Sequence, residues 1–106
     1  MQVFGNKKLT TSHFEDEKQY RRFLELSIKS LEYSRDLEKK GKLLFHGIAV
    51  GSSESYWVMN VKDHEEADLL LKGLPVFPYL QIETRPIVSP EHVLREIQDY
   101  LRQTKG

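Results

Sequence analysis

Residues 73–83 constrain the fold of this chain more than any other segment. Gly73 is followed closely by Pro75 and Pro78, and then by an alternating stretch, Leu-Gln-Ile-Glu. A glycine is typical of the left-handed residue that ends a helix, and prolines soon after it prevent the helix from resuming. The side chains between these breakers are apolar: Leu74, Val76, Phe77 and Tyr79. We therefore predict a helix end, an apolar turn and a strand, and we expect the turn to be covered by the domain's own core or by a second subunit.

Length and composition limit the class of protein. A chain of 106 residues has room for one hydrophobic core, so we expect a single domain over residues 1–106. Its 39% apolar and 30% charged residues are typical of an ordinary globular protein. Since no apolar run approaches the length of a membrane span and residues 1–6 lack the apolar core of a signal peptide, we predict a cytoplasmic protein with no membrane partner.

Charge and cysteine content exclude several function classes. Sixteen Lys and Arg balance sixteen Asp and Glu, so no global field attracts nucleic acid, and we expect no nucleic-acid partner. The absence of cysteine excludes disulfides, thiolate nucleophiles and cysteine-ligated zinc. The four histidines are dispersed without the spacing of metal ligands, so we predict neither a metal site nor a cofactor.

Three segments carry the signals of a helix start. The cap signals are Ser12 with Glu15, Asp63 with Glu66, and Ser89 with Pro90. They predict helices that run to Gly41, to Gly73 and to about residue 104. The last of these helices has one clear apolar stripe, formed by Val93, Leu94, Ile97, Tyr100 and Leu101.

The intervening segments are typical of strands. Residues 43–50 and 55–61 flank a Gly-Ser-Ser-Glu turn and predict a hairpin, and residues 79–87 predict a third strand. Residues 3–10 are a weaker fourth strand, accepted mainly because the topology needs it. The resulting order is βαββαβ with an added C-terminal helix. This is the ferredoxin-like α+β arrangement, with helices on one face of an antiparallel sheet.

Alternation along the strands assigns side chains to the two faces of the sheet. One predicted set, expected under the helices, is Leu44, His46, Ile48, Val50, Trp57, Met59, Val61, Leu80, Ile82 and Thr84. The other set is Phe45, Gly47, Ala49, Tyr56, Val58, Asn60, Tyr79, Gln81, Glu83 and Arg85. Because this second set mixes aromatic and polar groups, we expect a second copy to close over it and enclose a partly polar cavity.

The turn also carries a family resemblance. Its sequence, LPVFPYLQIE at residues 74–83, resembles the Leu-Pro-Leu-Phe-Pro-Tyr turn of the muconolactone isomerases. The likeness extends back through Gly41, Gly51, Tyr56, Val58 and Val61 in register, and so covers about half of the chain. The resemblance implies a ferredoxin-like fold that pairs into a dimeric α+β barrel and often stacks into larger rings. It also implies proton transfer between carbons of a small lactone as the family's chemistry.

The chain departs from this family at two places. The acidic residue that the family carries on its first helix falls on Ser30, which cannot act as a carboxylate base. The family's Trp-Arg pair falls on Gly47 and Ile48, so the cation that would hold a substrate carboxylate is missing there. We therefore expect a muconolactone isomerase-like protein that is not itself a muconolactone isomerase.

Two ionisable side chains are the candidate catalytic residues. Glu83 matches the family's glutamate and lies on the polar face of its strand, where enclosure in a dimer cavity would raise its pKa and make it a base. Arg85 shares that face and could hold an anion, or it could simply form a surface ion pair with Glu83. His46 lies among apolar residues, where it is either a second catalytic group or a hydrogen-bonded core histidine.

Aromatic and amide side chains complete the candidate site. Tyr56 and Tyr79 either line a pocket for a flat ligand or serve as packing, and Asn60 shares the face of Tyr56. Three functions therefore remain open. The first is a barrel that binds a small hydrophobic or aromatic-derived molecule and catalyses proton transfer or a related rearrangement. The second is a ligand-binding barrel without turnover. The third is a structural module that builds a homodimer or larger homo-oligomer.

Overall fold

The structure, a computed structural model, describes residues 1–9 and 14–104. In chain order the elements are β1 (Gln2–Leu9), α1 (Glu17–Lys39), β2 (Leu43–Ile48), β3 (Ser55–Asn60), α2 (His64–Lys72), a short 3₁₀ turn (Phe77–Tyr79), β4 (Leu80–Ile87) and α3 (Pro90–Gln103). The four strands form one antiparallel sheet in the order β2-β3-β1-β4. This is the ferredoxin-like order, so the predicted fold is confirmed.

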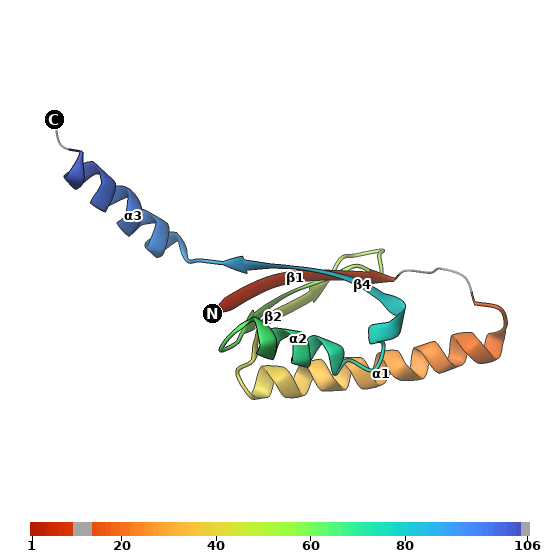
Figure 1. Cartoon of the computed structure of the whole chain (residues 1–106). Coiled ribbons are helices and arrows are strands. Elements are labelled where there is room, and N and C mark those ends of the chain that lie inside the picture. The colour runs from red at the N-terminus through yellow and green to blue at the C-terminus, as the bar shows by residue number, and fades with distance from the viewer. Residues whose placement is uncertain (10–13, 105–106) are drawn as a thin grey trace.

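Helices α1 and α2 lie on one face of the sheet and leave the other face open (Figure 1). We call these the helix-covered face and the open face. The core lies between the helices and the sheet and is formed by Val3, Leu37, Leu43, Trp57, Met59, Val61 and Ala67. Tyr33 ties the two helices together, because its hydroxyl donates a hydrogen bond to the Leu70 carbonyl at 2.6 Å.

The helix starts follow their cap residues. Asp63 accepts a hydrogen bond from the Glu66 amide at 2.8 Å, and Ser89 accepts one from the His92 amide at 3.1 Å, as predicted. Helix α1 begins later than predicted, at Glu17, because Asp16 is the cap and accepts from the Gln19 amide at 2.8 Å. Ser12, the predicted cap, lies outside the described residues.

Glycine ends both helices of the covered face, but for two different reasons. Gly41 follows α1 with a φ of 74°, the left-handed conformation that favours glycine. Gly73 was expected to adopt the same conformation, and this was wrong: its φ is −75°. A Cβ at Gly73 would clash with the Tyr33 hydroxyl, so the absence of a side chain there makes room for the link between α1 and α2.

The hairpin has the predicted faces except at its first residues and at Val50. Val50 was expected on the helix-covered face, but β2 ends at Ile48 and Val50 lies fully exposed in the turn. His46 lies opposite Trp57 and Ile48 lies opposite Ser55, on the helix-covered face. A β-bulge between Leu43 and Phe45 shifts the register, so Leu43 rather than Leu44 pairs with Met59 and is buried. Leu44 is 53% exposed, which corrects its predicted place in the core.

The apolar turn is covered by the chain's own helix. Leu74 and Val76 are buried, and the Val76 amide donates a hydrogen bond to the Ser30 hydroxyl of α1 at 3.1 Å. The Tyr79 ring meets Phe23 of α1 edge-on, with centroids 5.4 Å apart. Tyr79 therefore lies against α1 instead of sharing the open face with Glu83, because the 3₁₀ turn delays the start of β4 to Leu80.

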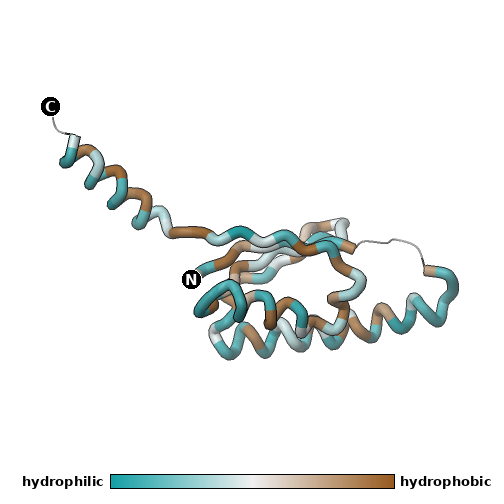
Figure 2. The backbone as a smooth tube through the Cα atoms, viewed as in Figure 1, coloured by the Kyte–Doolittle hydropathy of each residue, from teal (hydrophilic) through white to brown (hydrophobic). Residues whose placement is uncertain are grey.

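Helix α3 projects away from the sheet beyond the end of β4 (Figure 1), and the long axis of the molecule reaches 69 Å against 26 and 23 Å for the others. Its predicted apolar stripe is present and exposed, with Ile97 at 53% and Tyr100 at 65% (Figure 2). None of the described helices is both long and apolar enough to span a membrane.

Candidate functional site: a groove between helix α1 and the sheet

A groove of about 250 Å³ separates the first half of α1 from the helix-covered face of the sheet. It is lined by Lys7, Leu9, Phe23, Ser27, Ser30, Leu31, His46, Ile48, Ser53, Ser55, Val76 and Leu80. Most of these walls are apolar, while two ionisable groups and several hydroxyls converge on the same space. A mostly apolar cleft with a few convergent polar groups is typical of a small-molecule site, and this volume suits a compact ligand.

Lys7 reaches the groove because of its position on β1. Strand alternation places Val3, Gly5, Lys7 and Leu9 on the helix-covered face, where Lys7 lies opposite Ser55 of β3 and Ile82 of β4. Burial lowers the pKa of the Lys7 ammonium. Among the described residues no carboxylate forms an ion pair with Lys7, and its nearest recorded aromatic neighbour is the Trp57 ring, 6.0 Å from the nitrogen.

His46 enters the same space from β2. Burial lowers the pKa of its imidazole first, and the nearby positive charge of Lys7 lowers it further, while Glu38 acts weakly in the opposite direction. No described residue makes a hydrogen bond to the His46 side chain, so the alternative of a hydrogen-bonded core histidine has no partner in that part of the chain. The imidazole is therefore neutral at pH 7 and available as a proton acceptor.

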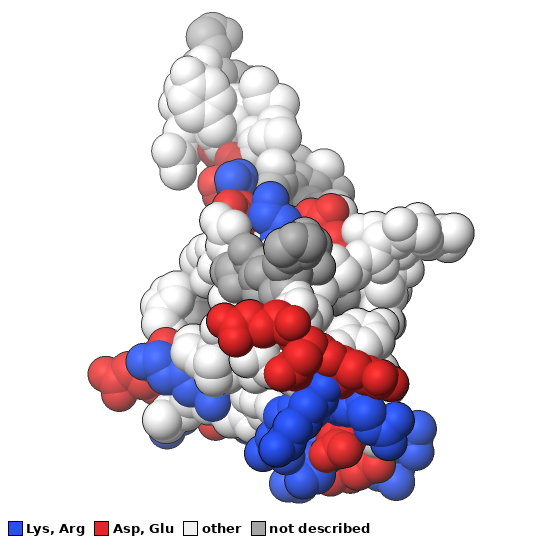
Figure 3. All heavy atoms as spheres, turned by 90° about the vertical axis from the view of Figure 1, so that its right-hand side faces the viewer, with Lys and Arg blue, Asp and Glu red and all other residues white. Residues whose placement is uncertain are grey.

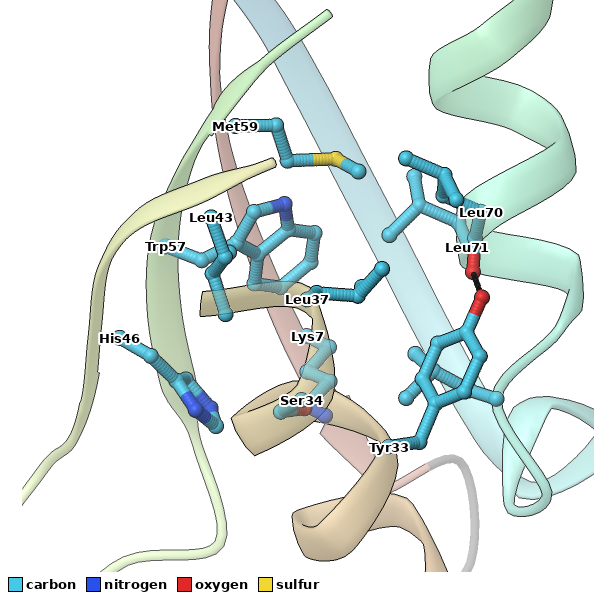
Figure 4. Close-up of a pocket in the computed structure, with 11 residues that line it drawn as sticks. Lys7, Tyr33, Ser34, Leu37, Leu43, His46, Trp57, Met59, Leu70 and Leu71 are labelled. Atoms are coloured by element: carbon cyan, nitrogen blue, oxygen red, sulfur yellow. Dashed lines mark hydrogen bonds between the residues drawn. The ribbon is translucent and has the colours of Figure 1, made fainter. Parts of the chain in front are cut away.

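A second, much smaller cavity continues from the groove towards α2. Its volume is about 20 Å³, and Lys7, His46, Ser34, Leu37, Trp57 and Met59 are among its lining residues (Figure 4). In this view Lys7 extends from β1 between His46 and Tyr33, towards Ser34 of α1. Lys7 and His46 thus border both spaces.

Two buried polar atoms near Lys7 have no hydrogen-bond partner among the described residues. Ser55 and Trp57 are each only 3% exposed, and neither the Ser55 hydroxyl nor the Trp57 indole N–H makes a hydrogen bond within the described part of the chain. Unpaired buried donors cost stability, so their presence beside a groove indicates groups kept for a ligand or a bound water. The indole fits here because Gly5 has no side chain: a Cβ at that position would clash with the Trp57 ring.

The open face carries four of the sequence-predicted residues. Glu83 and Arg85 border a shallow hollow of about 370 Å³ together with Phe4 and Asn6. Tyr56 stacks on Phe4 at a centroid distance of 6.3 Å, and burial together with the charge of Glu54 raises its pKa. Asn60 lies at the exposed end of β3, opposite Gln2.

The structure therefore separates the two predicted catalytic residues. His46 lies on the helix-covered face, whereas Glu83, Arg85, Tyr56 and Asn60 lie on the open face. In the described structure no ion pair joins Glu83 to Arg85. Sequence reasoning missed Lys7, although the alternation of Val3, Gly5 and Leu9 around it was a usable signal that it points towards the core.

The described surface does not favour nucleic-acid binding or metal binding. Where α1 begins, side chains of both signs gather side by side (Figure 3), and Glu17, Lys18, Arg21, Arg22 and Glu25 border a common hollow there. Such mixed charge gives no one-signed patch for nucleic acid. Within residues 1–9 and 14–104 no group of three histidine or acidic side chains could share a metal ion.

Topology and groove together define a ferredoxin-like α+β protein with a small, largely apolar cleft between its first helix and its sheet. The muconolactone delta-isomerase family model matches residues 9–92, which is most of the chain. The chain therefore belongs to the muconolactone delta-isomerase family.

Individual relatives agree with this assignment. The chain is 33% identical over 63 residues to a muconolactone delta-isomerase of Cupriavidus pinatubonensis (strain JMP 134 / LMG 1197), a match that covers 59% of this chain and 68% of the relative. It is 31% identical over 72 residues to muconolactone delta-isomerase 1 of Acinetobacter lwoffii, covering 68% and 75% of the two chains.

Two solved structures share the fold. A crystal structure of muconolactone isomerase at 3.3 Å resolution superposes with a TM-score of 0.69 at 23% identity and covers 85% of this chain and 92% of its own. The 5-chloro-2-hydroxyhydroquinone dehydrochlorinase of Burkholderia phenoliruptrix AC1100, in complex with 2,5-dihydroxybenzoquinone, superposes with a TM-score of 0.65 at 13% identity, covering 87% and 98%.

Proposed function

We propose that the groove between α1 and the sheet binds a compact carbonyl compound of hydrophobic or aromatic-derived character and transfers a proton on it. The observation that carries this proposal is the convergence of Lys7 and His46 on one apolar groove, beside two buried donors without partners. A proton shift next to a carbonyl needs a base and a group that steadies the enolate oxygen. The groove offers both within one chain.

In this mechanism His46 is the catalytic base. Because its pKa is lowered, the imidazole is neutral at pH 7 and can take a proton from the carbon next to the carbonyl. The negative charge that develops on oxygen is steadied by the Lys7 ammonium, which has no carboxylate partner in the described structure, and by the Ser55 hydroxyl. Return of the proton from His46 to another carbon of the same molecule completes a rearrangement.

The comparisons support the class of ligand. The relatives are named as isomerases of a lactone, and the structural neighbour is named as a dehydrochlorinase that holds a dihydroxybenzoquinone. Lactones and quinones are both compact carbonyl compounds. Since Ser30 occupies the place of the family's acid and is engaged with the Val76 amide, we propose a related reaction rather than muconolactone isomerisation itself.

Deuterium exchange tests this proposal directly. The protein is incubated in heavy water with a panel of unsaturated lactones, cyclic ketones and dihydroxyquinones, and the loss of carbon-bound protons is followed by NMR. His46→Gln removes the proposed base, and Glu83→Gln is the matched change on the open face. Exchange that requires His46 and tolerates Glu83→Gln supports the groove. Exchange that requires Glu83 instead would move the site to the open face, where Arg85, Tyr56 and Asn60 would then be the ligand-binding groups.

We also propose that the chain forms a homodimer or a larger homo-oligomer. A 14-residue helix that gains little from packing is marginal in water, and α3 projects away from the sheet and exposes five apolar side chains along one stripe. The open face exposes Phe45 at 55% and holds the stacked Phe4 and Tyr56 rings. A second copy that covers both surfaces would account for them, as the predicted dimeric barrel requires. A cytoplasmic location remains our prediction.

Binding without turnover is the remaining alternative. The Ser30 position favours it, because the family's acid is absent there. It predicts that a member of the panel protects the groove from hydrogen exchange while carbon-bound protons of the ligand stay in place.

A further inference from the structure

We propose that Lys7 is an imine-forming lysine, which condenses reversibly with an aldehyde or ketone bound in the groove. This inference deepens the proposed function, because it assigns the cationic group of the groove a covalent role. The Lys7 side chain lines an apolar groove together with His46, and this shared position points to an imine-forming role.

The surroundings of Lys7 differ from those of an ordinary surface lysine. Its neighbour Lys8 is exposed, while Lys7 turns inwards between Gly5 and Leu9. Elsewhere in the described structure, Lys42 pairs with Glu66 at 3.0 Å and Lys72 pairs with Asp68 at 2.9 Å. Lys7 has no such carboxylate partner within residues 1–9 and 14–104, where the neighbour that favours its ammonium form is the Trp57 ring, 6.0 Å away.

This environment makes the neutral amine, which is the nucleophile, easier to reach from the ammonium than at a surface lysine. Burial lowers the pKa of Lys7, and each unit of lowering increases the neutral fraction near pH 7 about tenfold. Within the described residues, the titratable group of β2 that interacts with Lys7 is His46, whose pKa the Lys7 charge lowers, and Glu38 of α1 acts on His46 in the opposite direction. Burial is the only cause of the shift at Lys7 itself. A desolvated lysine of this kind is suited to Schiff-base chemistry.

The step balances without any further reactant. Lys7 first gives its ammonium proton to the neutral imidazole of His46. The neutral amine then attacks the carbonyl carbon, and the carbon–oxygen double bond opens to a carbinolamine. Loss of the hydroxyl as water then leaves a protonated imine, so one ammonium and one carbonyl give one iminium and one water. His46 is placed to deliver the proton that the leaving hydroxyl needs and to take a proton from the adjacent carbon, which the iminium acidifies.

The ligand class follows from the walls of the groove. A space of about 250 Å³ lined by Leu9, Phe23, Leu31 and Ile48 suits a flat or compact apolar body. The carbonyl end would lie near Lys7 and the unpartnered Ser55 hydroxyl. Unhindered aldehydes and cyclic ketones fit this description, whereas esters and lactones would not lose their carbonyl oxygen as water and would bind without condensation.

Reductive trapping tests the inference. The full chain is incubated at pH 7 with benzaldehyde and a mild borohydride reductant, and the adduct is counted by intact-mass spectrometry and mapped by peptide digestion. We expect one fast adduct, on Lys7, which forms faster than on any other lysine, because burial lowers the pKa of its amine and the groove holds the aldehyde beside it. Lys7→Met should abolish this fast adduct, and Lys8→Met, on the opposite face, should leave it unchanged.

Three outcomes would overturn the inference. They are labelling spread over the surface lysines, labelling confined to the N-terminal amine of Met1, and fast labelling that survives Lys7→Met. Circular dichroism of Lys7→Met shows whether the variant folds, and if it does not, Lys7→Arg retains a cation that cannot condense and takes its place. Deuterium exchange that persists in Lys7→Arg without any adduct would leave the proposed function standing and remove only the covalent step.

Discussion

The two faces of the sheet carry similar kinds of side chain, ionisable and aromatic, but in different surroundings. Each face carries two ionisable side chains and one aromatic ring of β3: Lys7, His46 and Trp57 on the helix-covered face, and Glu83, Arg85 and Tyr56 on the open face. On the helix-covered face, Lys7 and His46 lie beside the buried Trp57, with pKa values lowered by burial. On the open face, Glu83 and Arg85 are exposed and border a shallow hollow. Enclosure by α1, rather than residue type, therefore distinguishes the candidate site.

Neighbouring residues of β3 give the largest test of this comparison. Trp57 and Tyr56 are adjacent in sequence and face opposite sides. We expect Trp57→Ala to lower the free energy of unfolding by about 3–5 kcal/mol, because it leaves a large cavity in the core. Tyr56→Ala should cost roughly 1 kcal/mol in a monomer, since it loses mainly the contact with Phe4. Urea denaturation measures both.

The same pair of variants reports on assembly. If a second copy covers the open face, the cost of Tyr56→Ala should grow with protein concentration, because the folded oligomer is then the stable species. Equal losses for the two variants at all concentrations would contradict the assignment of the faces.

The second test compares the two candidate bases. We expect His46→Gln to reduce carbon proton exchange on the active panel compound by roughly a hundredfold or more, as removal of a general base does. Glu83→Gln should change the rate less than about threefold, the scatter expected for a residue outside the site. The ratio of the two rates, measured by NMR under the same conditions, decides which face is the site.

Topology and faces could be predicted from the sequence because they depend on local signals. Caps at Asp63 and Ser89, the turn after Gly73 and the alternation of β4 are all set by neighbouring residues. The β-bulge at Leu44 and the delayed start of β4 could not be predicted, since they depend on packing between elements. The candidate site was only partly predicted. Glu83 was selected because it is a charged residue on the polar face of its strand, whereas Lys7 was missed because it lies in a strand whose polar residues weakened its prediction. Whether a polar residue is enclosed depends on the helix above it, and strand alternation alone does not describe that helix.

The third test concerns α3. Ile97→Lys places a charge in the middle of its exposed apolar stripe, and Gln103→Lys adds the same charge near the helix end, away from that stripe. We expect Ile97→Lys to weaken self-association by about 1–2 kcal/mol, or roughly tenfold in the dissociation constant, because it desolvates an unpaired charge at the contact. Gln103→Lys should change it little. Light scattering after size exclusion measures the assembly, and a stable monomer of the unaltered chain at micromolar concentration would disprove the dimeric barrel.

The fourth test uses the cost of keeping Lys7 charged. In the folded protein the pKa of Lys7 is lowered, so at pH 7 the unpaired ammonium opposes folding. Lys7→Met should therefore raise the free energy of unfolding by about 0.5–2 kcal/mol, the range for replacing a residue that is strained for function. The same variant should lose ligand binding. Lys8→Met, exposed on the other face, should change neither property, and a destabilised Lys7→Met would mean that the lysine has a structural role.

The smallest expected effect is a pH dependence carried by His46. Its pKa in the folded protein lies below the ordinary value of 6.5, so below pH 6.5 the unfolded chain binds the proton more readily. Stability should therefore be full above pH 6.5 and should fall as the pH drops towards the folded pKa. Thermal unfolding of His46→Phe should lose this decline, whereas the same change at the exposed His64 should preserve it. A ligand that binds the neutral imidazole would lower the pKa of His46 further and shift the decline to lower pH. One titration with and without ligand therefore tests both the burial of the imidazole and its contact with the bound molecule.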